Sequence, residues 1–289
     1  MWQSCAPMKN ETIILAHIEL AAIRWGMEDK PLILALHGWL DNAMSFKPLA
    51  EQLQRDYQIL AVEWPGHGYS QHRPGQYPLQ WSDYLFDLHC LLQWFGMQQP
   101  TAIMGHSLGA IIASSYNAIY PKQFNKMILI DGLFPLQEEA KLNKVRLQKS
   151  FLGHYKNVLK QQQLRRYRSL ESLVKARHKL TGLNETFCEL ILARNIKNDD
   201  IGSYLATDPR LKLDSPLRLT AEQVDNLMQV TDTPTLVITA KVLSEQQDLL
   251  MRQSFNSLAH HVIEGDHHLH MTSAVNTAKL VGGFIANGD

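Results

Sequence analysis

Residues 105–109 read GHSLG and fit the pattern G-x-S-x-G. They follow an apolar run at 101–104 and open a helical stretch from Ala110 to Tyr120. A buried strand that turns sharply into a helix holds a serine on a strained tip with its hydroxyl exposed, and glycines stand where a side chain would clash. The pattern in this position predicts that Ser107 is a nucleophile. The alternative interpretation is a plain structural turn.

The composition is that of an ordinary globular protein. The 289 residues are 45% hydrophobic and 19% charged, with a formal net charge of zero. This length can bury a large α/β core and an insertion, and the neutral balance gives no indication of a nucleic acid or an anionic membrane as partner. Cys5, Cys90 and Cys188 are odd in number and far apart, which is typical of reduced thiols. Residues 1–25 match neither a signal peptide nor a membrane span, so a cytoplasmic location is expected.

Apolar runs typical of buried strands alternate with helical patterns in two parts of the chain. After one or two edge strands within residues 12–25, the strands predicted are 32–36, 58–62, 101–104, 126–130, 235–239 and 260–263. The helices predicted are 45–53, 79–95, 110–120, 245–255 and 273–285.

The alternation stops between the two parts. Residues 133–230 are helical, polar and basic, with no convincing strand. One interruption of this kind predicts an α/β fold: a mostly parallel central sheet flanked by helices, with residues 1–132 and 231–289 as the core and 133–230 as an inserted helical cap. Ligands bind at the carboxyl ends of such strands, so the cap is expected to cover the binding site.

Three histidines gather in the segment GDHHLHM at 265–271. A serine nucleophile needs a neighbouring base, normally a histidine. This segment follows the last predicted strand, where the chain order nucleophile, acid, histidine places the base. We expect His267 to be the base, with His270 as second candidate and His268 in packing or substrate contact. The H-H-x-H segment is not accompanied by the carboxylate or cysteine ligands that complete a zinc site, so neither a metal nor a cofactor is expected.

Acyl transfer also requires two backbone N–H donors for the oxyanion. One is expected from Leu108, the residue after the nucleophile. The other is expected from Trp39, because Gly38 lets the loop after strand 32–36 turn inward. The alternative for that loop is a turn glycine beside a packed tryptophan.

Taken together, these segments resemble the α/β-hydrolase superfamily and, more narrowly, its serine hydrolase-like subgroup. The resemblance extends over nearly the whole chain and is carried by LHGWLDNAMSF (36–46), EWPGHGYS (63–70), GHSLGA (105–110), ILIDGL (128–133), DPRLKLDSPLRLT (208–220) and GDHHLHM (265–271). It implies Ser107 as nucleophile, His267 as base, and Trp39 with Leu108 as oxyanion donors. A serine at position 107 argues against the chemistry of haloalkane dehalogenases and epoxide hydrolases, which attack with a carboxylate.

The chain departs from the family pattern at the carboxylate residue that orients the catalytic histidine, here called the acid. The acid usually follows the strand at 235–239, but the loop there reads AKVLS, and the first carboxylates after it are Glu245 and Asp248. Haloalkane dehalogenases and some lipases place the acid after the preceding sheet strand, and Asp131 occupies that position here. The resemblance therefore implies Asp131 as the acid, with Glu245 or Asp248, or no functional acid, as alternatives. Asp131 also fits a simple turn residue.

Positive charge is concentrated in the expected cap. Between Lys141 and Lys179 there are twelve Lys or Arg residues and one acid, Glu171. This excess either steers anionic substrates toward the site or belongs to a solvated helical surface. Too few aromatic residues accompany it for an RNA-binding surface.

The sequence thus predicts a cofactor-free serine hydrolase that cleaves carboxylic esters or thioesters of small molecules through an acyl-enzyme. Two alternatives stay open. One is hydrolysis of a C–C bond, lactone or amide by the same residues, because one fold supports many reactions. The other is a degenerate site kept for binding.

Overall fold

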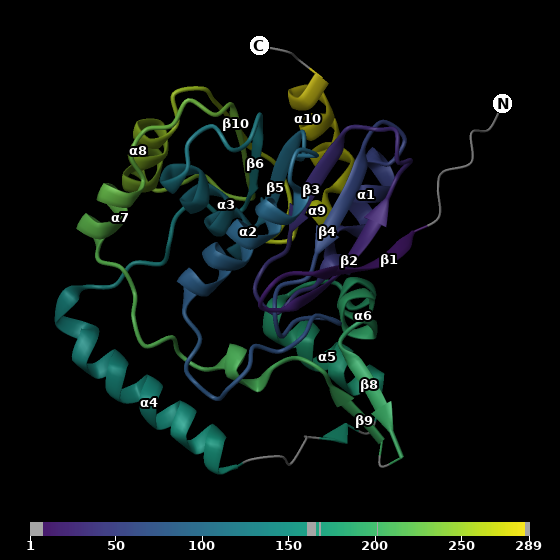
Figure 1. Cartoon of the computed structure of the whole chain (residues 1–289), viewed down its shortest axis with the longest axis vertical. Helices are drawn as coiled ribbons and strands as arrows, with labels where there is room; N and C mark the ends of the chain where they lie inside the picture. The colour runs from purple at the N-terminus through teal and green to yellow at the C-terminus, as the bar shows by residue number, and fades with distance from the viewer. Residues whose placement is uncertain (1–7, 161–165, 168, 201, 287–289) are drawn as a thin grey trace.

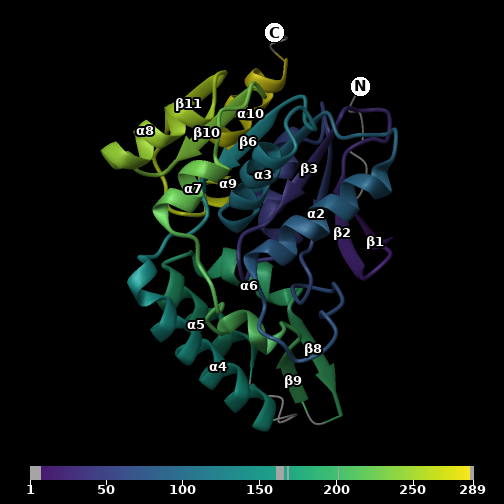
Figure 2. The same ribbon diagram turned by 60° about the vertical axis from the view of Figure 1, so that its left-hand side comes forward.

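The computed structural model describes residues 8–160, 166–167, 169–200 and 202–286. Eight strands form one sheet in the order β1-β2-β4-β3-β5-β6-β10-β11 (Figure 1 and Figure 2). Their bounds are β1 Lys9–Ile14, β2 Glu19–Trp25, β3 Leu32–Leu36, β4 Gln58–Val62, β5 Ala102–His106, β6 Met127–Ile130, β10 Thr235–Thr239 and β11 Leu258–Val262. β2 is antiparallel to β1 and β4, and every pair from β4 to β11 is parallel. The mostly parallel α/β sheet predicted from the sequence is confirmed.

Helices cover both faces of this sheet, as a parallel sheet requires. In β3, Ile33 packs with one hydrophobic cluster and Leu34 with the other, because successive side chains point to opposite faces. One face is covered by α1 (Lys47–Leu53), which follows the short helix η1 (Ala43–Phe46), and by α9 (Leu269–Thr272) and α10 (Ala274–Ala286), which follow the last strand. The other face is covered by α2 (Trp81–Phe95), α3 (Leu108–Ile119) and α8 (Glu245–Ser254).

The cap lies at the carboxyl edge of the sheet, below it in Figure 2. Its elements are η2 Ala140–Leu142, α4 Asn143–Leu159, β7 Arg166–Tyr167, α5 Leu170–Thr181, α6 Glu185–Ala193, β8 Ile196–Asp199, β9 Gly202–Leu205 and η3 Pro209–Lys212. Three of these are strands in a small sheet of order β7-β9-β8, so the expectation of no strand between 133 and 230 was wrong. The strands are two to four residues long and partly or fully exposed, so they carry no apolar alternation for a sequence pattern to detect.

The end of the insertion belongs to the packing of the core. Helix α7 (Ala221–Leu227) places Val224 in the hydrophobic cluster that also holds Tyr116 of α3. The division into core 1–132 with 231–289 and cap 133–230 stays a prediction, and this contact favours a boundary before α7.

Some of the positive charge concentrated in the cap is paired with carboxylates. Lys149, for example, contacts Asp214 at 2.9 Å.

The sequence led us to expect reduced thiols, no membrane-spanning segment and a cytoplasmic location. Cys90 and Cys188 are free thiols, one partly buried and the other buried, and Cys5 lies outside the described residues. Within the described part of the chain, no helix combines the length and the apolar composition that a bilayer crossing requires. The cytoplasmic location stays a prediction.

Buried polar contacts join the cap to the core. Arg194, which follows α6, donates through Nε to Glu63 Oε1 at 2.6 Å, and the exposed fractions of the two side chains are 7% and 0%. The Asn42 amide donates to the carbonyl of Ile191 at 2.8 Å. Glu63 also accepts from the backbone of Ala43 and Tyr69. A buried carboxylate with this many partners fixes the cap relative to the loop at the end of β4.

Replacing Arg194 with methionine is expected to destabilise the protein by about 3–5 kcal/mol, because Glu63 then stays buried without its charged partner. Urea unfolding followed by circular dichroism measures the change. Lys175→Met is the matched control, since Lys175 pairs with Glu171 on the exposed face of α5, and its unfolding midpoint should equal that of the wild type. An Arg194→Met midpoint equal to the wild type would contradict the anchoring role.

Candidate active site

Ser107 stands on a tight turn between β5 and α3. Its backbone has φ 50° and ψ −111°, which a residue with a side chain rarely adopts. The glycines on either side permit this turn: a Cβ on Gly105 would lie 2.4 Å from the backbone nitrogen of Ala110, and one on Gly109 would lie 2.0 Å from the carbonyl oxygen of Leu36. The predicted strand–serine–helix turn is confirmed, with the hydroxyl at the carboxyl edge of the sheet.

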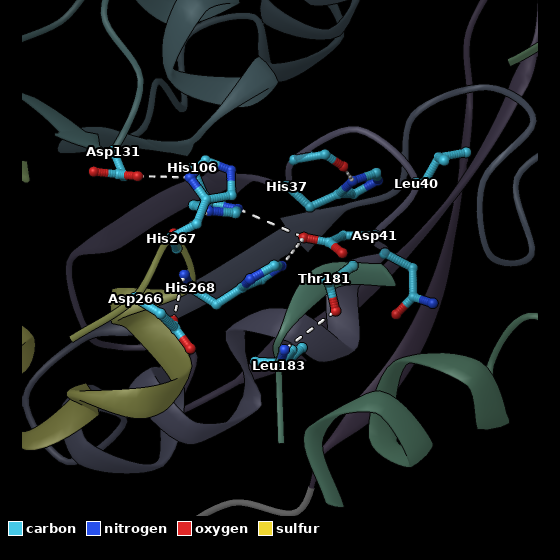
Figure 3. A network of polar contacts seen from close by, with 12 residues as sticks. His37, Leu40, Asp41, His106, Asp131, Thr181, Leu183, Asp266, His267 and His268 are labelled. Carbon is cyan, nitrogen blue, oxygen red and sulfur yellow. Dashed lines mark hydrogen bonds and ion pairs between the residues drawn. The ribbon is translucent and has the colours of Figure 1, made fainter. Parts of the chain in front are cut away.

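His267 and Asp131 form a hydrogen-bonded pair at the same edge. The imidazole Nδ1 lies 2.6 Å from Oδ2 of the carboxylate, as Figure 3 shows. Asp131 directly follows β6 and has φ 46°, a strained value for a residue with a side chain. Its second oxygen, Oδ1, accepts the backbone N–H of Ala240 at 3.0 Å. The loop after β10 therefore supplies a donor to this carboxylate.

The pair sets the protonation of the imidazole. Partial burial opposes ionisation of Asp131, but hydrogen bonds from the imidazole of His267 and the backbone N–H of Ala240 hold its pKa below the ordinary value. An ionised carboxylate only accepts hydrogen bonds, so Nδ1 of His267 carries the hydrogen and Nε2 has a free lone pair. The same contact raises the pKa of His267. The imidazole thus becomes the free base only at a pH above its ordinary pKa of 6.5.

The other two acid candidates lie elsewhere. Glu245 and Asp248 are in the first turn of α8. Glu245 is exposed. Asp248 pairs with Arg252 one turn further along, at 2.7 Å. Among the described residues, Asp131 is the carboxylate that contacts the ring of His267.

The two expected oxyanion donors flank the serine. Leu108 is the first residue of α3, and the first N–H groups of a helix have no partner within it. Trp39 follows the turn at Gly38, beyond the end of β3. Both residues line a cavity together with Ser107. Their role as oxyanion donors stays a prediction.

Two cavities meet at Ser107. One has a volume of about 750 Å³, lies under the cap helices α5 and α6, and is lined by Ser107 and His267. The other has a volume of about 320 Å³ and is lined by Ser107, Leu108 and residues of α2 and the loop after β6. Both volumes are within the range of small-molecule sites. The serine and the imidazole thus face the same cavity.

Comparisons with known proteins agree with the fold. The family model described as "alpha/beta hydrolase fold" matches residues 31–274. The chain belongs to the α/β-hydrolase superfamily. A crystal structure of a hypothetical protein of Pseudomonas aeruginosa PAO1 is similar to this α/β hydrolase with a TM-score of 0.86 and 31% identity, covering 96% of this chain and 99% of that one.

Named relatives narrow the family. The "Serine hydrolase-like protein" of Danio rerio is 24% identical over 92% of this chain and 85% of its own length. "Serine hydrolase-like protein 2" of Homo sapiens is 30% identical over 66% of this chain and 62% of its own length. The thioesterase domain from the curacin biosynthetic pathway, 19% identical with a TM-score of 0.81, shares the fold. The chain is thus a hydrolase of the serine hydrolase-like subgroup.

Behind the pair lies a buried cluster that sequence reasoning left without a role. Asp41 is 2% exposed, and its carboxylate faces His268 Nε2 at 3.3 Å and His106 Nδ1 at 3.6 Å (Figure 3). Arg177 of α5 donates to the same carboxylate. Burial opposes ionisation of Asp41, but the contact with His268 and the charge of Arg177 hold its pKa well below the ordinary value. In this α/β hydrolase, Asp41 joins the loop of Trp39 to the cap.

His106 ties the nucleophile turn to the segment of the base. Its Nε2 donates to the carbonyl oxygen of His267 at 2.9 Å. It is the variable residue before the serine in GHSLG, so the pattern itself gave no signal of this role. His270, the second candidate for the base, is fully buried beside Phe46, and burial holds its pKa well below the ordinary value. His268 contacts Asp41 and also lines the larger cavity, so packing and substrate contact both stay predictions for it.

Proposed function

We propose that this hydrolase cleaves carboxylic esters or thioesters of small to medium size through an acyl-enzyme intermediate. Ser107 would be the nucleophile, His267 the general base and acid, and Asp131 the residue that orients the imidazole. Trp39 and Leu108 would donate their backbone N–H groups to the oxyanion.

One observation carries the proposal. The 2.6 Å contact between His267 Nδ1 and Asp131 Oδ2 fixes the tautomer whose Nε2 can accept a proton. The serine that would give this proton stands on a strained turn and lines the same cavity. A strained nucleophile, a base and an orienting carboxylate in one place are the requirements of covalent catalysis by serine.

In the first half-reaction, the Ser107 hydroxyl attacks the carbonyl carbon while its proton passes to Nε2 of His267. The carbonyl oxygen becomes an anion and takes hydrogen bonds from the Trp39 and Leu108 amides. The imidazolium then protonates the leaving alcohol or thiol as the C–O or C–S bond breaks. An ester of Ser107 remains.

In the second half-reaction, water takes the place of the leaving group. His267 accepts a proton from the water, which attacks the acyl carbon and forms a second oxyanion. Collapse of this intermediate returns the proton from His267 to Ser107 and releases a carboxylic acid. Asp131 stays ionised throughout and stabilises the imidazolium in both steps.

Two measurements on the purified protein test the proposal. A fluorophosphonate probe should label the wild type and fail to label Ser107→Ala. A series of p-nitrophenyl esters with acyl chains from acetate to dodecanoate should release nitrophenol, with a burst where deacylation limits the rate. Absence of labelling in the wild type would favour a binding protein, and labelling together with inertness toward every ester would favour hydrolysis of a C–C bond, lactone or amide.

A further inference from the structure

The two cavities at Ser107 share part of their walls but differ in access to the base. Ser107, Trp39 and Lys212 line both. His267 lines the larger cavity and is absent from the lining of the smaller one. Trp39 is 52% exposed. Ser107 therefore lies at a junction with an imidazole on one side.

The chemistry of acyl transfer assigns a different part of an ester to each side. At the tetrahedral carbon, the serine oxygen and the oxyanion take two positions, and the acyl chain and the leaving group take the other two. The leaving atom must receive its proton from the imidazole, so the leaving group has to lie within reach of His267. The acyl chain then points away from the base, past Leu108.

We propose that the smaller cavity binds the acyl chain and that the larger cavity under the cap binds the leaving alcohol or thiol. This inference rests on the proposed function and names its substrate class: an ester or thioester with a shorter apolar acyl chain and a larger apolar leaving group.

The walls fit apolar groups on both sides. In the larger cavity, α5 and α6 contribute Leu173, Ala176, Leu180 and Leu192. In the smaller one, α2, α3 and the loop after β6 contribute Trp81, Ile111, Pro135 and Leu136.

A charged side chain in each wall is neutralised by a buried carboxylate. Arg177 of the larger cavity contacts Asp41, and Arg210 of the smaller one contacts Asp208 at 2.7 Å. Neither guanidinium is held as a free cation for a substrate carboxylate. Lys212 in both walls and Arg218 in the smaller one are further cationic side chains, so the fit to uncharged chains rests on the apolar residues named above.

Two tryptophan substitutions separate the cavities. Ile111→Trp narrows the smaller one and is expected to lower the ratio of kcat/KM for octanoate over acetate p-nitrophenyl esters by about tenfold or more. Ala176→Trp narrows the larger one and is expected to lower the ratio for naphthyl over methyl esters of one acid by a similar factor. Each variant should leave the other ratio near the wild-type value.

The rate of deacylation gives a second, independent test of which cavity binds the acyl chain. Once the leaving group has departed, the acyl chain alone occupies the site. Ile111→Trp should therefore change the breakdown rate of the octanoyl-enzyme, and Ala176→Trp should leave that rate as in the wild type. Leu136→Trp, at an exposed position in the smaller wall, repeats the first test where Ile111→Trp folds poorly.

Control variants place tryptophan on the same helices outside both linings. Ile119→Trp on α3 and Lys179→Trp on α5 should change neither ratio. If Ala176→Trp alters the acyl ratio or octanoyl-enzyme breakdown, or if both ratios fall in both variants, the assignment is overturned while the proposed function stands. If the wild type forms no acyl-enzyme with any ester or probe, both are overturned.

Discussion

Replacement of Ser107 by alanine is expected to lower kcat for ester hydrolysis by about a millionfold, with little change in KM. The hydroxyl supplies the atom that becomes acylated, and a nucleophile removed from a serine–histidine pair costs roughly this factor in a serine hydrolase. The residual activity would come from the oxyanion donors acting on water. Because the methyl group of alanine occupies less space than the serine side chain, binding of the ester in the two cavities should persist.

The measurement is a single-turnover and steady-state assay on an ester that the wild type cleaves, with the variant purified separately to exclude wild-type contamination. Ser115→Ala is the matched control, because Ser115 is buried on α3, the helix that follows Ser107, and lines neither cavity. Its kcat should stay within about threefold of the wild type, as expected of a residue that contacts no reacting atom. A Ser107→Ala variant that retained a tenth of the wild-type rate would overturn the nucleophile assignment.

The nucleophile turn was predictable from the sequence because its physics is local. A serine at φ 50° needs small residues on both sides, and Gly105 and Gly109 appear at the required spacing between an apolar run and a helical pattern. The positions of the parallel strands along the chain were predicted in the same way, from apolar runs of about five residues. These features need no knowledge of distant parts of the chain.

Contacts between distant segments were less accessible. The pairing of Asp131 with His267 joins residues 136 positions apart, and the sequence pattern left Glu245 and Asp248 open as alternatives. Asp41 and Arg177 form an ion pair across the interface of core and cap, and no sequence pattern around either residue predicts this contact. The short strands of the cap escaped detection because exposed polar strands lack the alternation that marks a buried face.

Replacement of Asp131 by asparagine is expected to lower kcat by about 10⁴-fold, the second largest effect at this site. An asparagine can donate to Nδ1 as well as accept from it, so the imidazole loses its preference for the tautomer with a free Nε2. The imidazolium formed in each half-reaction also loses the neighbouring negative charge. Glu245→Gln and Asp248→Asn are the matched controls, and both should keep the wild-type kcat, since neither carboxylate contacts His267.

The pH profile separates this role from a structural one. His267 must be neutral to accept a proton, and the contact with Asp131 raises its pKa. The acidic limb of kcat/KM in the wild type should therefore have its midpoint above 6.5, the ordinary value. In Asp131→Asn the raising contact is lost while burial still lowers the pKa, so the midpoint should move to lower pH along with the fall in rate. A variant with reduced rate and an unshifted limb would mean that Asp131 supports the turn after β6 and does not act on the base.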